Sequence, residues 1–136
     1  MEPAFPVEFV VQGTPVSLQG SSDSKRQWKE RVKKACTHLL PEGHWATQDE
    51  ISATLFYFPS DKMQGDVDNI VKMTLDALSK YIYVDDSQVT RVLVQKFEPG
   101  KVFSFKAPSA VLLEALNGDK PLLYIRLSKD PFEELK

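Results

Sequence analysis

Four aspartates are the side chains of this sequence most able to do chemistry. Asp66 and Asp68 are separated by one residue, and the adjacent pair Asp85 and Asp86 follows after a helix-length segment. Clustered carboxylates repel one another unless a cation offsets their charge, and hard ions such as Mg²⁺ take mainly carboxylate and water oxygens as ligands. A strand–turn–helix–turn–strand path could bring three or four of these carboxylates to one sheet edge. The spacing therefore supports the hypothesis of a divalent-metal site.

A purely structural interpretation of the same residues stays open. Asp68 precedes an apolar-periodic run, as a helix N-cap does, while Asp66 and the Asp85-Asp86 pair have the composition of turns. Lys72 lies one turn after Asp68, and Asp76 one turn further. Such an i,i+4 ladder is more often a salt-bridged, solvent-facing stripe than a catalytic row. On spacing alone, this structural interpretation is the more frequent one.

Other kinds of site lack support. A calcium-binding EF-hand loop starting at Asp66 would need an oxygen ligand and then a glycine where the chain has Ile70 and Val71. No GxxxxGK or GxGxxG phosphate loop is present. The lone Cys36 cannot form an internal disulfide, which indicates a reducing compartment.

Composition sets broader limits. The chain has 136 residues, of which 42% are hydrophobic, and this predicts a single domain over residues 1–136. Lys and Arg number 17 against 19 Asp and Glu, so the net charge is -2. A protein that binds polyanions through bulk charge is disfavoured, and any nucleic-acid role needs a segregated basic patch. No signal sequence or apolar run of about 20 residues is present, so we expect a soluble, cytoplasmic protein without a membrane span.

The elements that must position the aspartates can be predicted from periodicity. Val7, Phe9 and Val11 alternate with other residues in a first strand, and 51–58 is a second. An amphipathic helix from Asp68 to about Lys80 follows. Further strands are expected at 88–98, 102–105 and 122–127, a further helix at 108–116, and a frayed tail from 128. The mixture predicts an α+β fold with a partly antiparallel sheet and two to three packed helices.

One predicted helix is strongly basic. Ser24 and Gln27 have capping-box spacing, and apolar residues recur at helical intervals until Pro41. Its other face carries Lys25, Arg26, Lys29, Arg31, Lys33 and Lys34 against Glu30 alone. This helix is a candidate phosphate-contacting stripe, and a solvated helix face is the alternative.

The full string around the aspartates is more specific than any single pair. It reads D-x-D-N-x-x-K-x-x-x-D-A-L over residues 66–78, followed by D-D-x-Q-V over residues 85–89. These eleven specified positions in fixed order strongly resemble the RusA family of Holliday junction resolvases. The resemblance is strongest over about residues 54–96, and it favours function over the structural interpretation.

The resemblance implies a fold and an activity. The family consists of small homodimeric α+β endonucleases that bind four-way DNA junctions and cut two strands symmetrically with Mg²⁺. By resemblance, Asp66, Asp68 and Asp86 are metal-binding catalytic residues, and Lys72 is the catalytic lysine. Asn69, Asp76 and Asp85 match positions expected to support the site through capping, hydrogen bonding or helix anchoring.

Two alternatives to junction resolution remain at this point. The acidic net charge and the looser match outside the motif are compatible with an inactive relative that serves as a nucleic-acid or protein interaction module. An active nuclease that prefers flaps, forks or other branched DNA is the second alternative.

Overall fold

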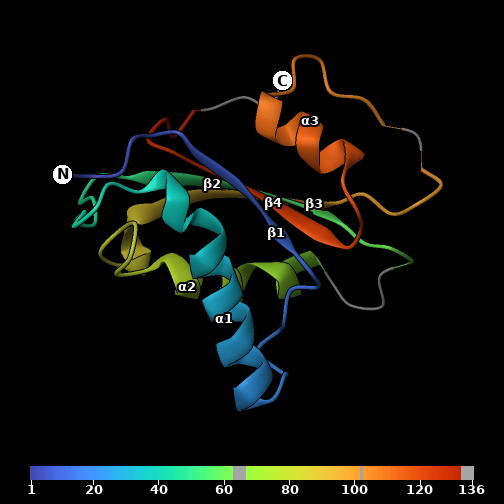
Figure 1. The fold of residues 1–136 in the computed structure, drawn as a ribbon, viewed down its shortest axis with the longest axis horizontal. Coiled ribbons are helices and arrows are strands. Elements are labelled where there is room, and N and C mark those ends of the chain that lie inside the picture. Colours follow the sequence, from blue (N-terminus) through green and yellow to red (C-terminus); the bar gives the residue numbers. More distant parts are fainter. Residues whose placement is uncertain (63–66, 102, 133–136) are drawn as a thin grey trace.

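A mixed four-stranded sheet in the order β1–β4–β2–β3 forms the centre of the molecule (Figure 1). The structure is a computed structural model that describes residues 1–62, 67–101 and 103–132. The strands are β1 (Val7–Gln12), β2 (Ile51–Phe58), β3 (Val89–Lys96) and β4 (Leu122–Ser128). β4 is antiparallel to β1 and β2, whereas β2 and β3 are parallel. The expected α+β class with a partly antiparallel sheet is confirmed.

Helices cover both faces of this sheet. They are α1 (Ser22–Cys36), α2 (Val71–Leu78) and α3 (Ala110–Asn117). Figure 1 shows α1 and α2 on one face and α3 on the other. β1 buries alternate residues toward α1 and α2, as its period-2 pattern predicts. β2 is buried along its whole length because both of its faces are covered. No described helix is long and apolar enough to span a bilayer.

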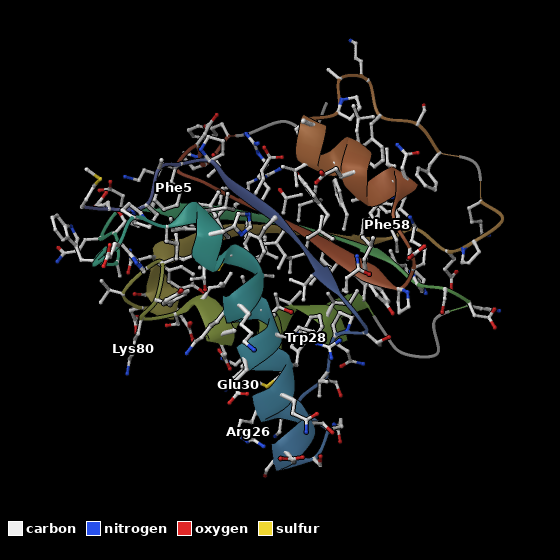
Figure 2. All side chains as sticks on the ribbon, in the orientation of Figure 1. Phe5, Arg26, Trp28, Glu30, Phe58 and Lys80 are labelled. Atoms are coloured by element: carbon white, nitrogen blue, oxygen red, sulfur yellow. The ribbon has the colours of Figure 1, made fainter. Side chains whose placement is uncertain are left out.

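α2 belongs to the crossover that links the parallel strands β2 and β3, and it is anchored on α1. The indole Nε1 of Trp28 donates a hydrogen bond of 3.0 Å to Thr74 Oγ1, and the Thr74 hydroxyl donates to Ile70 O at 2.9 Å. Trp28, which Figure 2 labels on α1, and Thr74 are both buried. One face of α2 is thereby fixed against α1, and the opposite face is left for the site.

Two helix boundaries differ from the predictions. Ser21, rather than Ser24, is the N-cap of α1, and its hydroxyl oxygen accepts the backbone N–H of Ser24 at 3.0 Å. α2 ends at Leu78 rather than near residue 80, because Ser79 is extended and Lys80 has a φ of 67°. The chain therefore turns toward β3 earlier than the helical pattern indicates.

Two further predictions are wrong in the described residues. Residues 103–105 are not a strand; they lie in a loop whose phenylalanines pack on the α3 side of the sheet. The ring centroids of Phe103 and Phe97 are 4.7 Å apart, and those of Phe105 and Phe56 are 5.5 Å apart. The tail does not fray at Ser128, because that residue ends β4 in register with Ser52.

Candidate active site

A groove of about 660 Å³ runs between α2 and the edge strand β3. Five of the residues predicted to form or support the site line it together, namely Asp68, Asn69, Lys72, Asp76 and Asp86. Its apolar wall comprises Leu18, Val71, Leu75, Tyr83, Val89, Val92 and Val94. The crossover topology thus places ionisable groups from both ends of the β2–α2–β3 unit on one surface.

The entry to α2 presents Asp68 to this groove. Asp68 and Asn69 lie in the short 3₁₀ helix η2 (Val67–Ile70), which continues directly into α2. The N-cap of α2 is Ile70, so the structural interpretation of Asp68 as the cap of this helix is wrong. The Asp68 side chain is exposed, and its carboxylate is available on the groove surface.

Lys72 lies between two carboxylates of the groove. Its Nζ is 2.9 Å from Asp76 Oδ1 and 3.5 Å from Asp86 Oδ2. The hydrogen bond to Asp76 and the charge of that carboxylate are the main causes that raise the pKa of Lys72, and Asp86 adds a smaller effect. Half-exposed ion pairs of this kind contribute little to stability, about 0–1 kcal/mol. Their consequence here is to favour further the charged form of Lys72, which a lysine with its ordinary pKa already has at neutral pH.

Asp85 has a different role from its neighbour Asp86. It caps the 3₁₀ helix η3 (Asp86–Gln88), and its Oδ2 accepts hydrogen bonds from the backbone N–H of Ser87 at 3.1 Å and from the Ser87 hydroxyl at 2.6 Å. These bonds lower the pKa of Asp85. The supporting role expected for Asp85 takes the form of a cap, which leaves Asp86 facing the groove.

Gln88 holds this turn in place and was assigned no role from the sequence. Its Oε1 accepts the backbone N–H groups of Val84 at 2.7 Å and Asp85 at 2.8 Å. Its Nε2 donates to the carbonyls of Thr47 at 2.8 Å and Asp49 at 2.9 Å. The signal that could have identified Gln88 is the Asp-x-x-Gln spacing, since a reciprocal capping box needs an acceptor and a Gln three residues later.

Tyr83 is a second residue that the sequence reasoning missed. Its side chain is fully buried at the groove, and its hydroxyl donates a hydrogen bond of 2.6 Å to Leu75 O. Burial is the main cause that raises its pKa, and the negative charges of Asp86 and Asp76 raise it further. Tyr83 therefore stays neutral. Its hydrogen bond to Leu75, the residue before Asp76, connects α2 to the segment that leads to Asp86.

The donor chemistry of the groove suits Mg²⁺. Asp68 and Asp86 supply carboxylate oxygens on an open surface, and the Lys72 ammonium near Asp86 shows that positive charge is stabilised there. Asp66, the third predicted ligand, lies outside the described residues. Within those residues, no group of three or more His, Cys, Asp or Glu side chains is placed to hold a metal ion. The three-ligand metal site therefore stays a prediction.

The six basic residues of α1 do not form one continuous surface. A second groove of about 440 Å³, which Met73 of α2 also lines, contains Lys25, Arg26, Lys29 and Lys33. Arg26 is paired with Asp23 and with Glu30, the latter at 3.3 Å, and Glu30 also lines this groove; Figure 2 labels Arg26 and Glu30 on α1. The Arg31 Nη1 donates to Gln12 O at 3.1 Å, which binds it to the end of β1.

The basic groove borders the acidic one. Lys25 Nζ donates a hydrogen bond of 3.2 Å to the carbonyl of Leu18, whose residue lines the acidic groove. Met73 of the basic groove directly follows Lys72 in α2. Lys25, Lys29 and Lys33 thus form a lysine stripe along the basic groove with the i,i+4 spacing of one helix side, and Lys25 joins that stripe to Leu18 of the acidic groove.

Comparison with known proteins gives one family match. The family model described as "Endodeoxyribonuclease RusA" matches residues 14–104. No curated protein matches the chain. The matched range includes every residue named here as lining either groove.

Proposed function

This chain belongs to the RusA family of endodeoxyribonucleases, and on that basis we propose that it is a Mg²⁺-dependent resolvase of Holliday junctions. Membership of the family supports a nuclease of the Holliday junction resolvase kind in general. The proposal of Mg²⁺-dependent junction cleavage is carried by a single observation. Asp68 of η2, Lys72 of α2 and Asp86 of η3 all line the same groove. The products are two symmetrically cut strands.

The proposed chemistry assigns a separate task to each group. Asp66, Asp68 and Asp86 would hold Mg²⁺, and the bound ion would lower the pKa of a water molecule and offset charge on the scissile phosphate. The Lys72 ammonium stabilises negative charge on the phosphate oxygens as it develops in the transition state. Asp85 caps the turn that presents the Asp86 carboxylate.

DNA binding is proposed to use the lysine stripe of α1 rather than all six basic residues. Lys25, Lys29 and Lys33 line the basic groove, and Lys25 is bonded to the carbonyl of Leu18 at the carboxylate groove, so a DNA strand that leaves the carboxylate groove on this side would meet their ammonium groups. Arg31 is engaged with the carbonyl of Gln12. A homodimer would double the stripe and match the pseudo-two-fold symmetry of a four-way junction.

The activity is tested by incubating a synthetic four-way junction with the purified protein, with and without Mg²⁺. Asp68→Asn should abolish cleavage while junction binding is retained, because a carboxylate ligand is lost and no lysine of the stripe is altered. Asp119→Asn, an exposed aspartate between α3 and β4, is the matched control and should cut normally. Cleavage by Asp68→Asn at the wild-type rate would contradict the proposal.

Substrate preference is tested by competition among junction, flap, fork and duplex DNA at one fixed salt concentration. Electrostatic binding compresses apparent specificity at low salt, so the comparison belongs at moderate ionic strength. Preferential cutting of flaps or forks would favour the second alternative. Mg²⁺-independent binding of the junction without any nicking would favour the inactive interaction module, the alternative with which the net charge of -2 is compatible.

The lysine stripe is tested by a pair of substitutions on the same helix. Lys29→Ala should weaken junction binding and reduce the slope of log K against log salt by about one, because one phosphate contact is lost. Lys34 is an exposed lysine of α1 that does not line the basic groove, and Lys34→Ala should leave the slope unchanged. Equal effects of the two substitutions would contradict the assignment of the stripe.

A further inference from the structure

We propose that Asp76 is a positioning residue that draws the Lys72 ammonium toward itself and so limits its pairing with Asp86, which leaves the Asp86 carboxylate able to bind a divalent cation. The inference rests on the proposed function and adds a role for Asp76. Asp76 is not itself proposed to touch the metal or the DNA.

The distances favour Asp76 as the principal partner of Lys72. Lys72 Nζ lies 2.9 Å from Asp76 Oδ1 but 3.5 Å from Asp86 Oδ2. The Asp76 side chain is 21% exposed, whereas that of Asp86 is 56% exposed. The less hydrated carboxylate, one turn along the same helix, therefore makes the closer contact, and Asp86 is the more accessible to an ion from solvent.

The backbone around Asp76 is held independently of Lys72. Tyr83 donates its hydroxyl hydrogen to Leu75 O, and the C-cap N–H of Ser79 also bonds to Leu75 O at 3.1 Å. Asp76 is thus attached to a fixed helix end, while the lysine side chain that it restrains is half-exposed and flexible.

Loss of Asp76 would change where the ammonium resides. Among the described residues, Asp86 would then be the one remaining carboxylate of the two that pair with Lys72. A lysine paired more fully with Asp86 competes directly with a divalent cation for the same carboxylate oxygens. Removing Asp76 should therefore weaken metal binding through Lys72, although Asp76 is no ligand.

The test measures Mn²⁺ binding to the full chain by electron paramagnetic resonance, without DNA. Asp76→Ala should weaken Mn²⁺ binding roughly tenfold, the lower end of what partners of metal ligands typically contribute. In a Lys72→Met background the same substitution should change Mn²⁺ binding by less than about twofold. Asp76→Asn, which preserves the shape of the side chain, should behave like Asp76→Ala and guards against a folding defect.

A matched control is available at another lysine that joins two carboxylates. Lys129 Nζ lies 2.9 Å from Asp49 Oδ2 and 3.0 Å from Glu2 Oε1, away from the groove. Glu2→Ala removes an ion pair of nearly the same length at a residue that does not line the groove, and it should leave Mn²⁺ binding unchanged.

The outcomes separate the inference from the proposed function. An equal loss of Mn²⁺ binding in both backgrounds would show that Asp76 acts on the metal without Lys72, and would overturn the inference while leaving the nuclease intact. No loss in either background would overturn it as well. A wild-type protein that neither binds Mn²⁺ nor cuts junctions would overturn the proposed function first, and the inference with it.

Discussion

Replacement of Gln88 tests how the carboxylate groove is held together. Its half-buried amide makes four hydrogen bonds to the backbone: two with N–H groups of the turn that carries Asp86, and two with carbonyls of the segment at residues 47–49. Gln88→Ala removes all four. Gln88→Glu keeps the two accepted bonds but places a carboxylate oxygen against the carbonyl oxygens of Thr47 and Asp49.

The magnitude follows from the bonds lost. Each intramolecular hydrogen bond contributes about 0.5–1.5 kcal/mol net, and removing one partner adds the desolvation of groups left buried. Because the site is only half-buried, water can replace part of what is lost, so Gln88→Ala should reduce the free energy of unfolding by about 2–3 kcal/mol. Gln88→Glu should be at least as destabilising at neutral pH. Junction cleavage should fall roughly tenfold or more, since Asp86 loses its support.

Urea unfolding followed by circular dichroism provides the assay, with cleavage measured on the same preparations. Gln27→Ala is the matched control, because the Gln27 amide makes one 2.9 Å bond to Asp23 on the exposed surface of α1. That substitution should change the unfolding free energy by less than about 0.5 kcal/mol. A Gln88→Ala protein no less stable than Gln27→Ala, or a Gln88→Glu protein as stable as wild type, would refute the reasoning.

Three further predictions concern the rest of the molecule. Burial raises the pKa of the Cys36 thiol to about 11, so the native protein should resist a thiol reagent that labels the urea-unfolded chain within minutes, and rapid native labelling would contradict this packing. Hydrogen bonds from Ser87 lower the pKa of Asp85 in the folded protein below its ordinary 3.8. The ionised Asp85 side chain therefore contributes its full stabilisation above pH 3.8, and this stabilisation is lost as the pH falls through the lowered pKa of the folded state. The stability difference between wild type and Asp85→Asn should therefore shrink below about pH 4 in urea unfolding, and a difference constant with pH would argue against it. Trp28→Phe should reduce the unfolding free energy by about 1–3 kcal/mol, because the buried hydroxyl of Thr74 loses its indole donor, and an unchanged midpoint of denaturation would show that this bond contributes nothing.

Much of the fold could be predicted because its elements have strong periodicity. The alternation in β1 and the apolar runs of β2 and β4 follow directly from which faces of the sheet are covered. The error at 103–105 arose because aromatic residues favour strands, whereas here Phe105 packs in a tilted contact on Phe56 of β2, and Phe103 packs on Phe97 while staying 39% exposed. Serines at 21, 22 and 24 all suit an N-cap, so local chemistry alone could not select Ser21.

The candidate site was predictable to the extent that it is local in sequence. Asp68, Lys72 and Asp76 share one side of a continuous helical path, so their proximity follows from helical geometry. The pairing of Lys72 with a second carboxylate, that of Asp86, was not predictable. It depends on how the chain turns between α2 and η3, which brings Asp86 Oδ2 to 3.5 Å from Lys72 Nζ. The structural interpretation was correct in part, since the Lys72–Asp76 salt bridge occurs and Asp85 lies in the turn between α2 and β3.

The position of β3 at the margin of the sheet determines how a long polymer can reach the carboxylates. No described strand pairs with its outer edge, and the groove beside it is bounded by exposed side chains, with Val92 at 42% and Leu18 at 57% of full exposure. A strand of DNA can therefore be laid into the groove from the side at any point along its length. The DNA needs no free end, because it does not have to be threaded through an enclosed channel. Access without a free end is what an enzyme requires when it cuts within a chain rather than from its terminus.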